Sequence, residues 1–170
     1  QSWVVARVYP IRVAGNSGPM RGETTWEELG LEPELTTVTQ KVRRVGAWDL
    51  DLVRRAVQAN GGHNAKLIIS MVDQVVPEFK EFARLYDSDN ERWDGEGQLH
   101  DHPAIAKANK WFKENLEGVG TRLAGFTFSP TQILWTTFAK ELPEDKVVPT
   151  KHLDKQVIDA VVVEFAGEGE

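Results

Sequence analysis

The chain contains no cysteine and carries a net charge of −6 over its 170 residues. Without thiols it forms no disulfide and offers no thiolate ligands to a metal, and the lack of cysteine fits a reducing compartment. The negative charge gives no support for binding nucleic acid or a bilayer by bulk attraction. No apolar run reaches the roughly 20 residues of a membrane span. We therefore expect small-molecule partners, with neither nucleic acid nor membrane among them.

Two further features are missing. No segment matches the phosphate-binding pattern Gly-x-x-x-x-Gly-Lys-[Ser/Thr], and the chain begins at Gln1 and not at Met. The second observation predicts either a processed chain or a segment of a longer polypeptide. The length is sufficient for one domain with a substantial core, and the apolar content of 41% is ordinary for a globular protein.

Apolar runs alternate with amphipathic segments, which predicts an α/β fold with a mostly parallel sheet flanked by helices. The expected strands are Trp3–Val8, Lys66–Val72, Thr121–Phe128 and Val157–Phe165. The expected helices are Leu50–Ala59 with Asp49 as its N-cap, Val75–Tyr86, Pro103–Leu116 and Gln132–Ala139.

The pattern divides the chain into a domain over residues 1–140 and a C-terminal extension over residues 141–170. The acidic, non-periodic stretch at about residues 87–101 is expected to be an exposed insertion in the domain. The extension is expected to carry the terminal strand and to end in a frayed tail.

The segment Thr36–Asp49 combines hydroxyls with cations, stops at Gly46 and opens an amphipathic helix. Cations beside hydroxyls in a turn can hold a carboxylate and a phosphate together, because Arg binds through a fork and Lys as a point charge. The alternative is a solvated basic loop without a ligand.

Polar residues also follow the predicted strands, at Asn16–Pro19, Asp73 and Ser129. Parallel α/β sheets bind ligands at the carboxyl ends of their strands, so this shared position predicts a site there. His100 and His102 lie in the acidic region, where we expect an incidental exposed pair more than a metal site.

Thr39–Asp49, followed by Leu52–Asn60, resembles the adenylosuccinate synthetase family, whose members carry Thr-x-Arg-x-Arg-Arg-x-Gly, an Asp and a helix with Arg-Arg-Ala-Val. Arg12–Pro19 is similar to the family's Arg-Val-Gly-x-Gly-Pro loop. Ile68–Asp73 is similar to its Leu-Thr-Lys-Leu-Asp strand end. The resemblance runs from about Val4 to about Ile133 and fits the C-terminal half of such an enzyme.

The resemblance implies a substrate site in two parts. Thr39, Lys41 and Arg43 would hold the carboxylates of L-aspartate, with Lys41 in place of the family's first arginine. Lys keeps the charge but loses the bidentate geometry. The loop residues Asn16, Ser17 and Gly18 would contact the acceptor nucleotide, although Ala14 displaces the family's first glycine and the residues alone also fit a plain turn.

The resemblance also implies a site for the triphosphate, formed by Ser70, Met71, Asp73, Ser129 and Pro130. Met71 replaces the family's lysine, and Ser129-Pro130 replaces its Ser/Thr-Gly-Pro turn. Two departures at one subsite predict that guanine is not recognised in the usual way, as in the phage 2-aminoadenylosuccinate synthetases, which relax this preference toward adenine nucleotides. Alternatively, Met71 is simply a core residue.

The function implied is part of a ligase that joins L-aspartate to a 6-oxopurine monophosphate, IMP or (d)GMP, with hydrolysis of a nucleoside triphosphate. The implied cofactor is Mg²⁺ with GTP or ATP/dATP, with the metal ligands, the phosphate loop and the catalytic residues all outside this segment. The chain alone is therefore expected to be inactive. A homodimer or an association with an N-terminal half, in the cytoplasm (of the host if viral), is expected. The alternative is a non-catalytic nucleotide-binding or scaffold domain.

Overall fold

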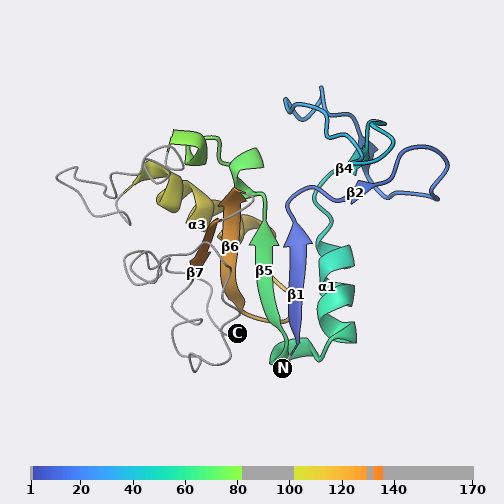
Figure 1. Ribbon diagram of the computed structural model, residues 1–170. Helices are drawn as coiled ribbons and strands as arrows, with labels where there is room; N and C mark the ends of the chain where they lie inside the picture. The colour runs from blue at the N-terminus through green and yellow to red at the C-terminus, as the bar shows by residue number, and fades with distance from the viewer. Residues whose placement is uncertain (1, 82–101, 130–131, 136–170) are drawn as a thin grey trace.

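A computed structural model describes residues 2–81, 102–129 and 132–135, and its main feature is a four-stranded sheet (Figure 1). The strands are β1 (Trp3–Arg7), β5 (Lys66–Ser70), β6 (Leu123–Ser129) and β7 (Gln132–Trp135), in the order β1-β5-β6-β7. The pairs β1–β5 and β5–β6 are parallel, while β6–β7 is antiparallel. The expected α/β class with a mostly parallel, helix-flanked sheet is confirmed.

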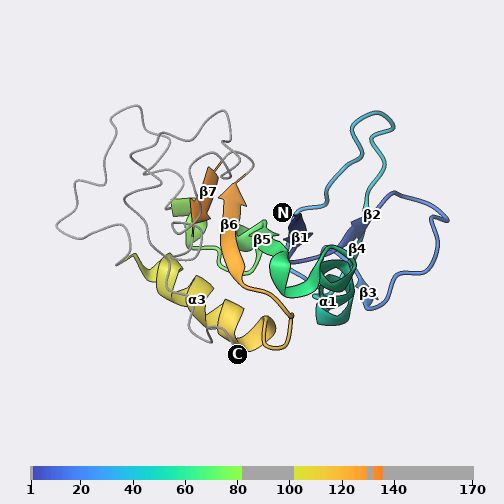
Figure 2. The same ribbon diagram turned by 90° about the horizontal axis from the view of Figure 1, so that it is seen from below.

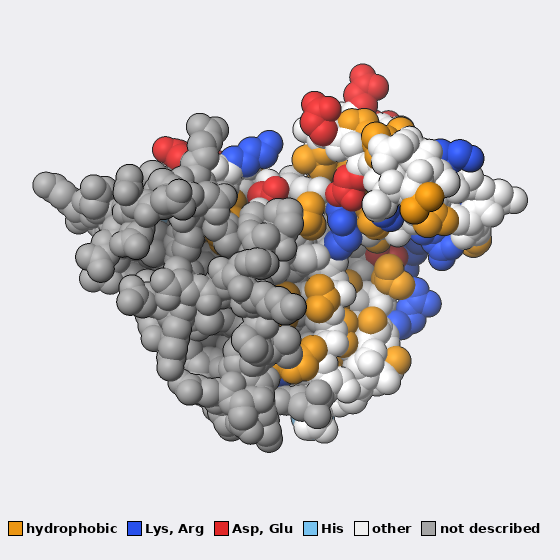
Figure 3. Space-filling view, viewed as in Figure 1, with side chains coloured by type: hydrophobic (Ala, Val, Ile, Leu, Met, Phe, Trp, Pro, Cys, Tyr) orange, Lys and Arg blue, Asp and Glu red, His pale blue; other side chains and the backbone are white. Residues whose placement is uncertain are grey.

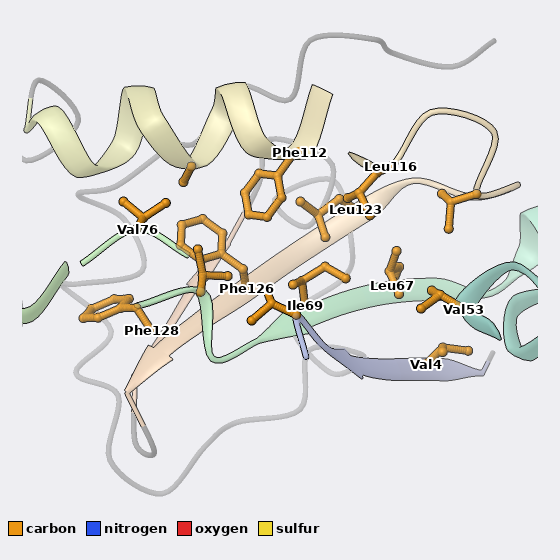
Figure 4. Packing of buried hydrophobic residues seen from close by; sticks show 14 of the residues in the cluster. Val4, Val53, Leu67, Ile69, Val76, Phe112, Leu116, Leu123, Phe126 and Phe128 are labelled. Atoms are coloured by element: carbon orange, nitrogen blue, oxygen red, sulfur yellow. The ribbon is translucent and has the colours of Figure 1, made fainter. Parts of the chain in front are cut away.

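Helices α1 (Leu50–Ala59) and α3 (Pro103–Asn115) lie on the same side of this sheet (Figure 2). Each provides the crossover between two parallel strands, α1 between β1 and β5 and α3 between β5 and β6. The core forms between helices and sheet, where Phe112 of α3 packs on Phe126 of β6 at a ring separation of 5.1 Å (Figure 4). Phe79 packs on Phe126 and stacks on Phe128, which extends the core along β6.

The expected boundaries of both helices are confirmed to within one residue. Asp49 caps α1, because its carboxylate accepts a hydrogen bond from the Leu52 N–H at 3.1 Å. At the other end Gly61 adopts φ +113°, a conformation that a side chain would strain. His102 caps α3 through Nδ1, which accepts from the Ala104 N–H at 3.1 Å. The expectation of an exposed residue is therefore wrong for His102, which is buried as a helix cap, while His100 lies outside the described residues.

Strand β5 ends at Ser70, two residues before the expected end at Val72. Met71 has φ +64°, in the left-handed region, and breaks the ladder. A 3₁₀ turn, η2 (Val72–Gln74), follows directly. The apolar pattern continues past the true end of the strand because Val72 is buried in the core as part of this turn.

The expected helix Gln132–Ala139 is wrong, because Gln132–Trp135 is the strand β7. It folds back antiparallel on β6, with Gly125 opposite Trp135 and Thr127 opposite Ile133. Cross-strand pairing with a long neighbouring strand overrides the weak helical pattern of such a short segment.

The region between β1 and α1 holds a second, smaller sheet that the sequence pattern does not indicate. It consists of β2 (Ile11–Arg12), β3 (Glu23–Thr24) and β4 (Arg44–Gly46), antiparallel in the order β2-β4-β3. Figure 1 shows β2 and β4 beyond the carboxyl end of β1, so this region stands over the end of the main sheet where ligands bind in α/β folds.

Strand β1 is an edge strand of the described sheet, which corrects the expectation of a fully buried strand. Val4 faces the core, but the side chain of Val5 is 65% exposed.

The helix expected from Val75 begins at Phe79 and is described only to Glu81. The stretch 87–101, the extension 141–170 with its strand, and the boundary between the two proposed domains lie outside the described residues. No helix in the described part of the chain is long and apolar enough to cross a bilayer.

The N-cap of α1 provides a first testable prediction. Asp49→Ala removes the acceptor for the Leu52 N–H and should lower the free energy of unfolding by about 1 kcal/mol. Asp49→Asn should keep most of this stability, because Asn caps helices about as well as Asp. Urea denaturation followed by circular dichroism measures both variants, and an equal loss in the two would contradict a capping role.

Candidate functional site

Four polar side chains meet at the carboxyl ends of β1 and β5, and we call them the sheet-end cluster: Arg7, Glu34, Asp73 and Gln74. Arg7 ends β1 and forms an ion pair with Glu34. The carboxylate of Glu34 also accepts a hydrogen bond from Gln74 Nε2 at 3.4 Å. Asp73 precedes Gln74 in η2 and lies within the electrostatic influence of both Arg7 and Glu34. The end of the parallel sheet therefore carries charged groups from three separate parts of the chain.

Asp73 is the electrostatically unusual member of this cluster. Burial raises the pKa of its carboxyl above the ordinary value of 3.8, and this effect exceeds the opposing hydrogen bond from its own backbone and the attraction of Lys80 and Arg7. Its Oδ1 is buried and has no hydrogen-bond partner among the described residues, and the same holds for Oε1 of Gln74. A carboxylate kept partly dehydrated at a strand end is a common feature of binding sites.

The turn that positions Asp73 is held by neighbouring strands. The N–H of Met71 donates to Thr127 Oγ1 of β6 at 3.2 Å, and Ser70 Oγ donates to the Ala6 carbonyl of β1 at 3.4 Å. Met71 is only partly buried and packs against the core. Of the proposed nucleotide-binding residues, Ser70, Met71 and Asp73 are thus contiguous at the sheet end.

The aspartate-binding candidates lie on a hairpin over residues 35–42, which we call the threonine hairpin. Leu35 and Val42 pair across its base, and the Thr36 N–H donates to the Lys41 carbonyl at 2.8 Å. The hydroxyls of Thr36 and Thr39 are 2.6 Å apart, so they share a hydrogen bond across the turn. Thr39 and Lys41 are both exposed, which leaves the ammonium of Lys41 accessible to a ligand.

Arg43 follows the threonine hairpin and is fixed through its backbone. Its N–H donates to the Glu34 carbonyl at 2.8 Å, and its carbonyl accepts from the buried Trp26 through Nε1 at 2.7 Å. Its guanidinium forms no ion pair with the described residues. A fixed backbone with an unpaired cation is the arrangement expected of a residue that binds an anion.

The glycine loop containing Asn16, Ser17 and Gly18 is held by two arginines. Arg12 donates to the Ser17 carbonyl, while Arg44 donates to Ser17 Oγ at 2.9 Å and to the Gly18 carbonyl at 2.7 Å. Gly18 has φ +96°, and a Cβ there would approach Arg12 Nη1 to 3.0 Å. The loop therefore has a defined shape, and Asn16 remains exposed on it.

Arg44 itself is engaged in a bidentate ion pair with Glu23, both contacts at 2.7 Å. The hydrogen bonds from Arg44 lower the pKa of the Glu23 carboxyl. Arg44 thus stabilises the small sheet and the glycine loop, whereas its neighbour Arg43 forms no ion pair with the described residues.

The remaining candidates can be placed only in part. Ser129 is the last residue of β6, and Pro130 lies outside the described residues. The sequence analysis missed Arg7, Glu34, Gln74 and Arg44 as site residues. Arg7 and Gln74 each stand next to a predicted strand end and could have been found by that signal, whereas Glu34 had none.

Within the described ranges, no group of three or more His, Asp or Glu side chains could hold a metal.

Comparison with known proteins agrees with the resemblance seen in the sequence. The N6-succino-2-amino-2'-deoxyadenylate synthase of Vibrio phage phiVC8 is 53% identical over 55 residues, which covers 31% of this chain and 16% of that protein. The enzyme of the same name from Acinetobacter phage SH-Ab 15497 is 34% identical over 98 residues, covering 50% of this chain and 22% of that protein. No protein-family profile matches the chain.

One solved structure is also similar, the cyanophage S-2L succinoaminodeoxyadenylate synthetase bound to dGMP and to dATP as an energy donor. It shares 21% sequence identity over 76% of this chain and 31% of its own, with a TM-score of 0.48, a value too low to establish a common fold.

The sequence matches confirm the predicted resemblance to the phage branch of adenylosuccinate synthetase-like enzymes. These relatives are ligases that act on purine nucleotides. The matched regions span about a sixth to a fifth of the length of the curated relatives.

The raised pKa of Asp73 provides a second prediction. Because the folded chain binds the proton more tightly than the unfolded chain, the ionised carboxylate destabilises the fold at pH values above about 3.8, and this penalty disappears as the pH falls. Asp73→Asn should therefore raise the free energy of unfolding at pH 7, by at most about 1 kcal/mol because the side chain is partly exposed and solvent screens its charge. The gain should vanish near pH 3.

Asp51→Asn is the control of opposite sign. The pKa of Asp51 is lowered by its hydrogen bond from Arg21, so this variant should lose stability at pH 7 and match the wild type in acid. Denaturant titrations at pH 3, 5 and 7 measure both variants. A pH-independent effect of Asp73→Asn would show that desolvation of its charge is not the cause.

Proposed function

We propose that this chain forms part of a ligase that joins L-aspartate to a purine nucleotide, and that it supplies the aspartate site and part of the nucleotide site. The observation that carries the proposal is the 53% identity over 55 residues with the synthase of phage phiVC8. Its support in the structure is local: the backbone of Arg43 is bonded to Glu34 of the sheet-end cluster, its guanidinium has no ion pair with the described residues, and the partly dehydrated carboxylate of Asp73 follows the end of β5, where α/β folds bind ligands.

The acceptor we propose is deoxyguanylate, with IMP the less favoured choice. The names of the curated relatives describe a product with a succino group on N6 of a 2-amino-purine deoxynucleotide. A 2-amino group with a new nitrogen at position 6 corresponds to a guanine base that has exchanged its 6-oxygen for the amine of aspartate. The proposed contacts to this nucleotide are Asn16, Ser17 and Gly18 on the glycine loop, which two arginines hold in shape.

Aspartate would bind between the threonine hairpin and Arg43. Its carboxylates carry two negative charges, and Lys41 with Arg43 offers two cations two residues apart on the same arm of the hairpin base. Thr39 would add a hydroxyl, since its Oγ1 already shares a hydrogen bond with Thr36 and is held toward the turn. Cations at this position would orient the amine of aspartate for attack on the activated purine carbon and offset the negative charge in the transition state.

The triphosphate would place its base against Ser70, Met71, Asp73, Ser129 and Pro130. The buried Oδ1 of Asp73 has no hydrogen-bond partner among the described residues, and a carboxylate oxygen of this kind would suit the amino group of adenine. Met71 gives a soft apolar surface for a purine face. We propose ATP or dATP as the donor, with Mg²⁺ bound by its phosphates and by residues outside this segment.

The parts that this segment lacks would come from the rest of a longer protein or from a partner chain. The outer side of β1 supports this, because a groove of about 260 Å³ lies between β1 and α1, lined mainly by apolar residues such as Val5, Leu52 and Val53. Val5 and Leu52 are exposed, and Figure 3 shows hydrophobic side chains open on this face. A sheet edge that the described residues leave uncovered is normally paired or packed by another segment or chain. We propose the cytoplasm of a phage host as the setting, because the curated relatives are phage enzymes.

A non-catalytic nucleotide-binding or scaffold domain is the second candidate. It would have the same fold but no requirement for an unpaired Arg43 beside exposed Thr39 and Lys41. The two candidates are separated by a chimera in which this chain replaces the matching segment of the phiVC8 synthase. Formation of the succino-deoxynucleotide from dGMP, aspartate and ATP, followed by chromatography, would support the ligase. A folded chimera that binds nucleotide but forms no product would support the scaffold.

Arg43 provides the third prediction. Arg43→Ala in the chimera should weaken aspartate binding by about 2–4 kcal/mol, seen as a higher KM for aspartate, because the bound carboxylate would lose its guanidinium partner in a site closed around the ligand. Arg43→Lys should recover only part of this, since it keeps the charge without the fork. Arg55→Ala, on the exposed face of α1, is the control and should leave KM unchanged. An unchanged KM in Arg43→Ala would remove Arg43 from the aspartate site.

The fourth prediction concerns the donor. ATP or dATP should serve at least as well as GTP, because losing the family's lysine and Gly-Pro turn removes features around guanine, each worth roughly 1–3 kcal/mol of discrimination. Competition kinetics in the chimera measure the ratio. Met71→Lys, which restores the lysine, should shift the ratio toward GTP about tenfold. A wild-type preference for GTP above about a hundredfold would show that Asp73 alone recognises guanine.

A further inference from the structure

Glu34 occupies a position between the two halves of the proposed site. It precedes the threonine hairpin, which carries Thr39 and Lys41, and its carboxylate reaches the sheet-end cluster. Its side chain is about a quarter exposed, as is that of its ion-pair partner Arg7. Neither the sequence resemblance nor the comparisons assign a role to Glu34.

On the hairpin side, Glu34 acts through its backbone. Its carbonyl accepts the Arg43 N–H at 2.8 Å, directly beside the Leu35–Val42 pair that closes the hairpin. The carbonyl and the carboxylate belong to one residue, so a displacement of Arg43 and the hairpin base displaces the carboxylate as well.

On the sheet side, the carboxylate of Glu34 acts on η2. It is held by Arg7 and accepts from Gln74 Nε2 at 3.4 Å. A carboxylate only accepts, so it fixes the amide of Gln74 with its NH₂ group toward Glu34 and its Oε1 away. Gln74 is the residue after Asp73 in the same turn, and its N–H bonds the Met71 carbonyl at 3.0 Å. The orientation of this turn therefore depends on where Glu34 stands.

We propose that Glu34 is a positioning residue that couples the threonine hairpin to the η2 turn, so that a nucleotide at Asp73 strengthens binding of aspartate at Lys41 and Arg43. The inference rests on the proposed function, because it uses the two subsites named there. Coupling between sites is reciprocal, so aspartate strengthens nucleotide binding by the same factor. Glu34 acts through Arg43 and Gln74 and touches neither substrate.

The first test measures this factor by calorimetry in the chimera. Aspartate is titrated without nucleotide and with saturating non-hydrolysable ATP, and the ratio of the two dissociation constants gives the coupling. We expect a ratio of at least about fivefold in the wild type, the lower end for coupled sites. Glu34→Gln, which removes the charge at nearly constant size, should bring the ratio close to one.

Glu32→Gln is the matched control, because Glu32 is exposed, lies two residues away and forms no ion pair with the described residues. It should keep the wild-type ratio. Equal ratios in Glu34→Gln and the wild type would overturn the proposal. A wild-type chimera that binds neither ligand would instead overturn the proposed function, and the coupling would then be decided by the second test.

The second test needs no ligand and uses the 170-residue chain. Gln74→Ala should raise hydrogen exchange of the amides of Lys41 and Arg43 about threefold, as expected for the loss of a modest polar contact transmitted to the hairpin. In the Glu34→Gln background the same change should have no further effect. Glu34 does not connect the threonine hairpin to η2 if Gln74→Ala leaves hydrogen exchange in the hairpin unchanged. The same conclusion follows if Gln74→Ala raises this exchange equally in the wild-type and Glu34→Gln backgrounds.

Discussion

The parallel pairing of β5 with both β1 and β6 is the constraint on which the rest of the structure depends. It brings the carboxyl ends of these three strands to the same end of the sheet. Helices α1 and α3 make the crossover connections that parallel strands require. Leu67 and Ile69 of β5 are fully buried, so this strand cannot shift by one residue without turning its apolar side chains away from the core. The position of Asp73 beyond its end is fixed by the same register.

The region between β1 and α1 supplies most of the charged and polar groups near this end of the sheet. Polar contacts organise it more than apolar burial does, since Arg44 joins Glu23 to the glycine loop and Arg7 joins Glu34 to the end of β1. Arg44 and Arg43 differ in their contacts. Arg44 has a carboxylate partner in Glu23, whereas Arg43 is fixed through its backbone. A site built in this way can change its ligands through loop residues while the sheet stays the same.

Some parts of this arrangement could be predicted from local sequence and others could not. The helix Leu50–Ala59 was predicted with its cap because the signals are local: an Asp before the first turn, a 3.6-residue apolar period and a glycine pair after it. The strand Gln132–Trp135 was predicted as a helix because its conformation comes from pairing with β6. Glu34 gave no signal, since its importance lies in contacts with Arg7 and Gln74, which are distant in the chain.

The sequence by itself determined the α/β class, the boundaries of α1 and α3 and the resemblance to adenylosuccinate synthetase-like enzymes, and it suggested part of the candidate site, because periodicity, caps and motifs are written in short stretches of chain. Only the tertiary structure decided that Arg44 is engaged by Glu23 while Arg43 has no ion pair with the described residues, that Met71 ends its strand in a left-handed turn, and that Asp73 is desolvated. These properties depend on which distant groups approach each side chain, and that is set by the packing of the whole sheet.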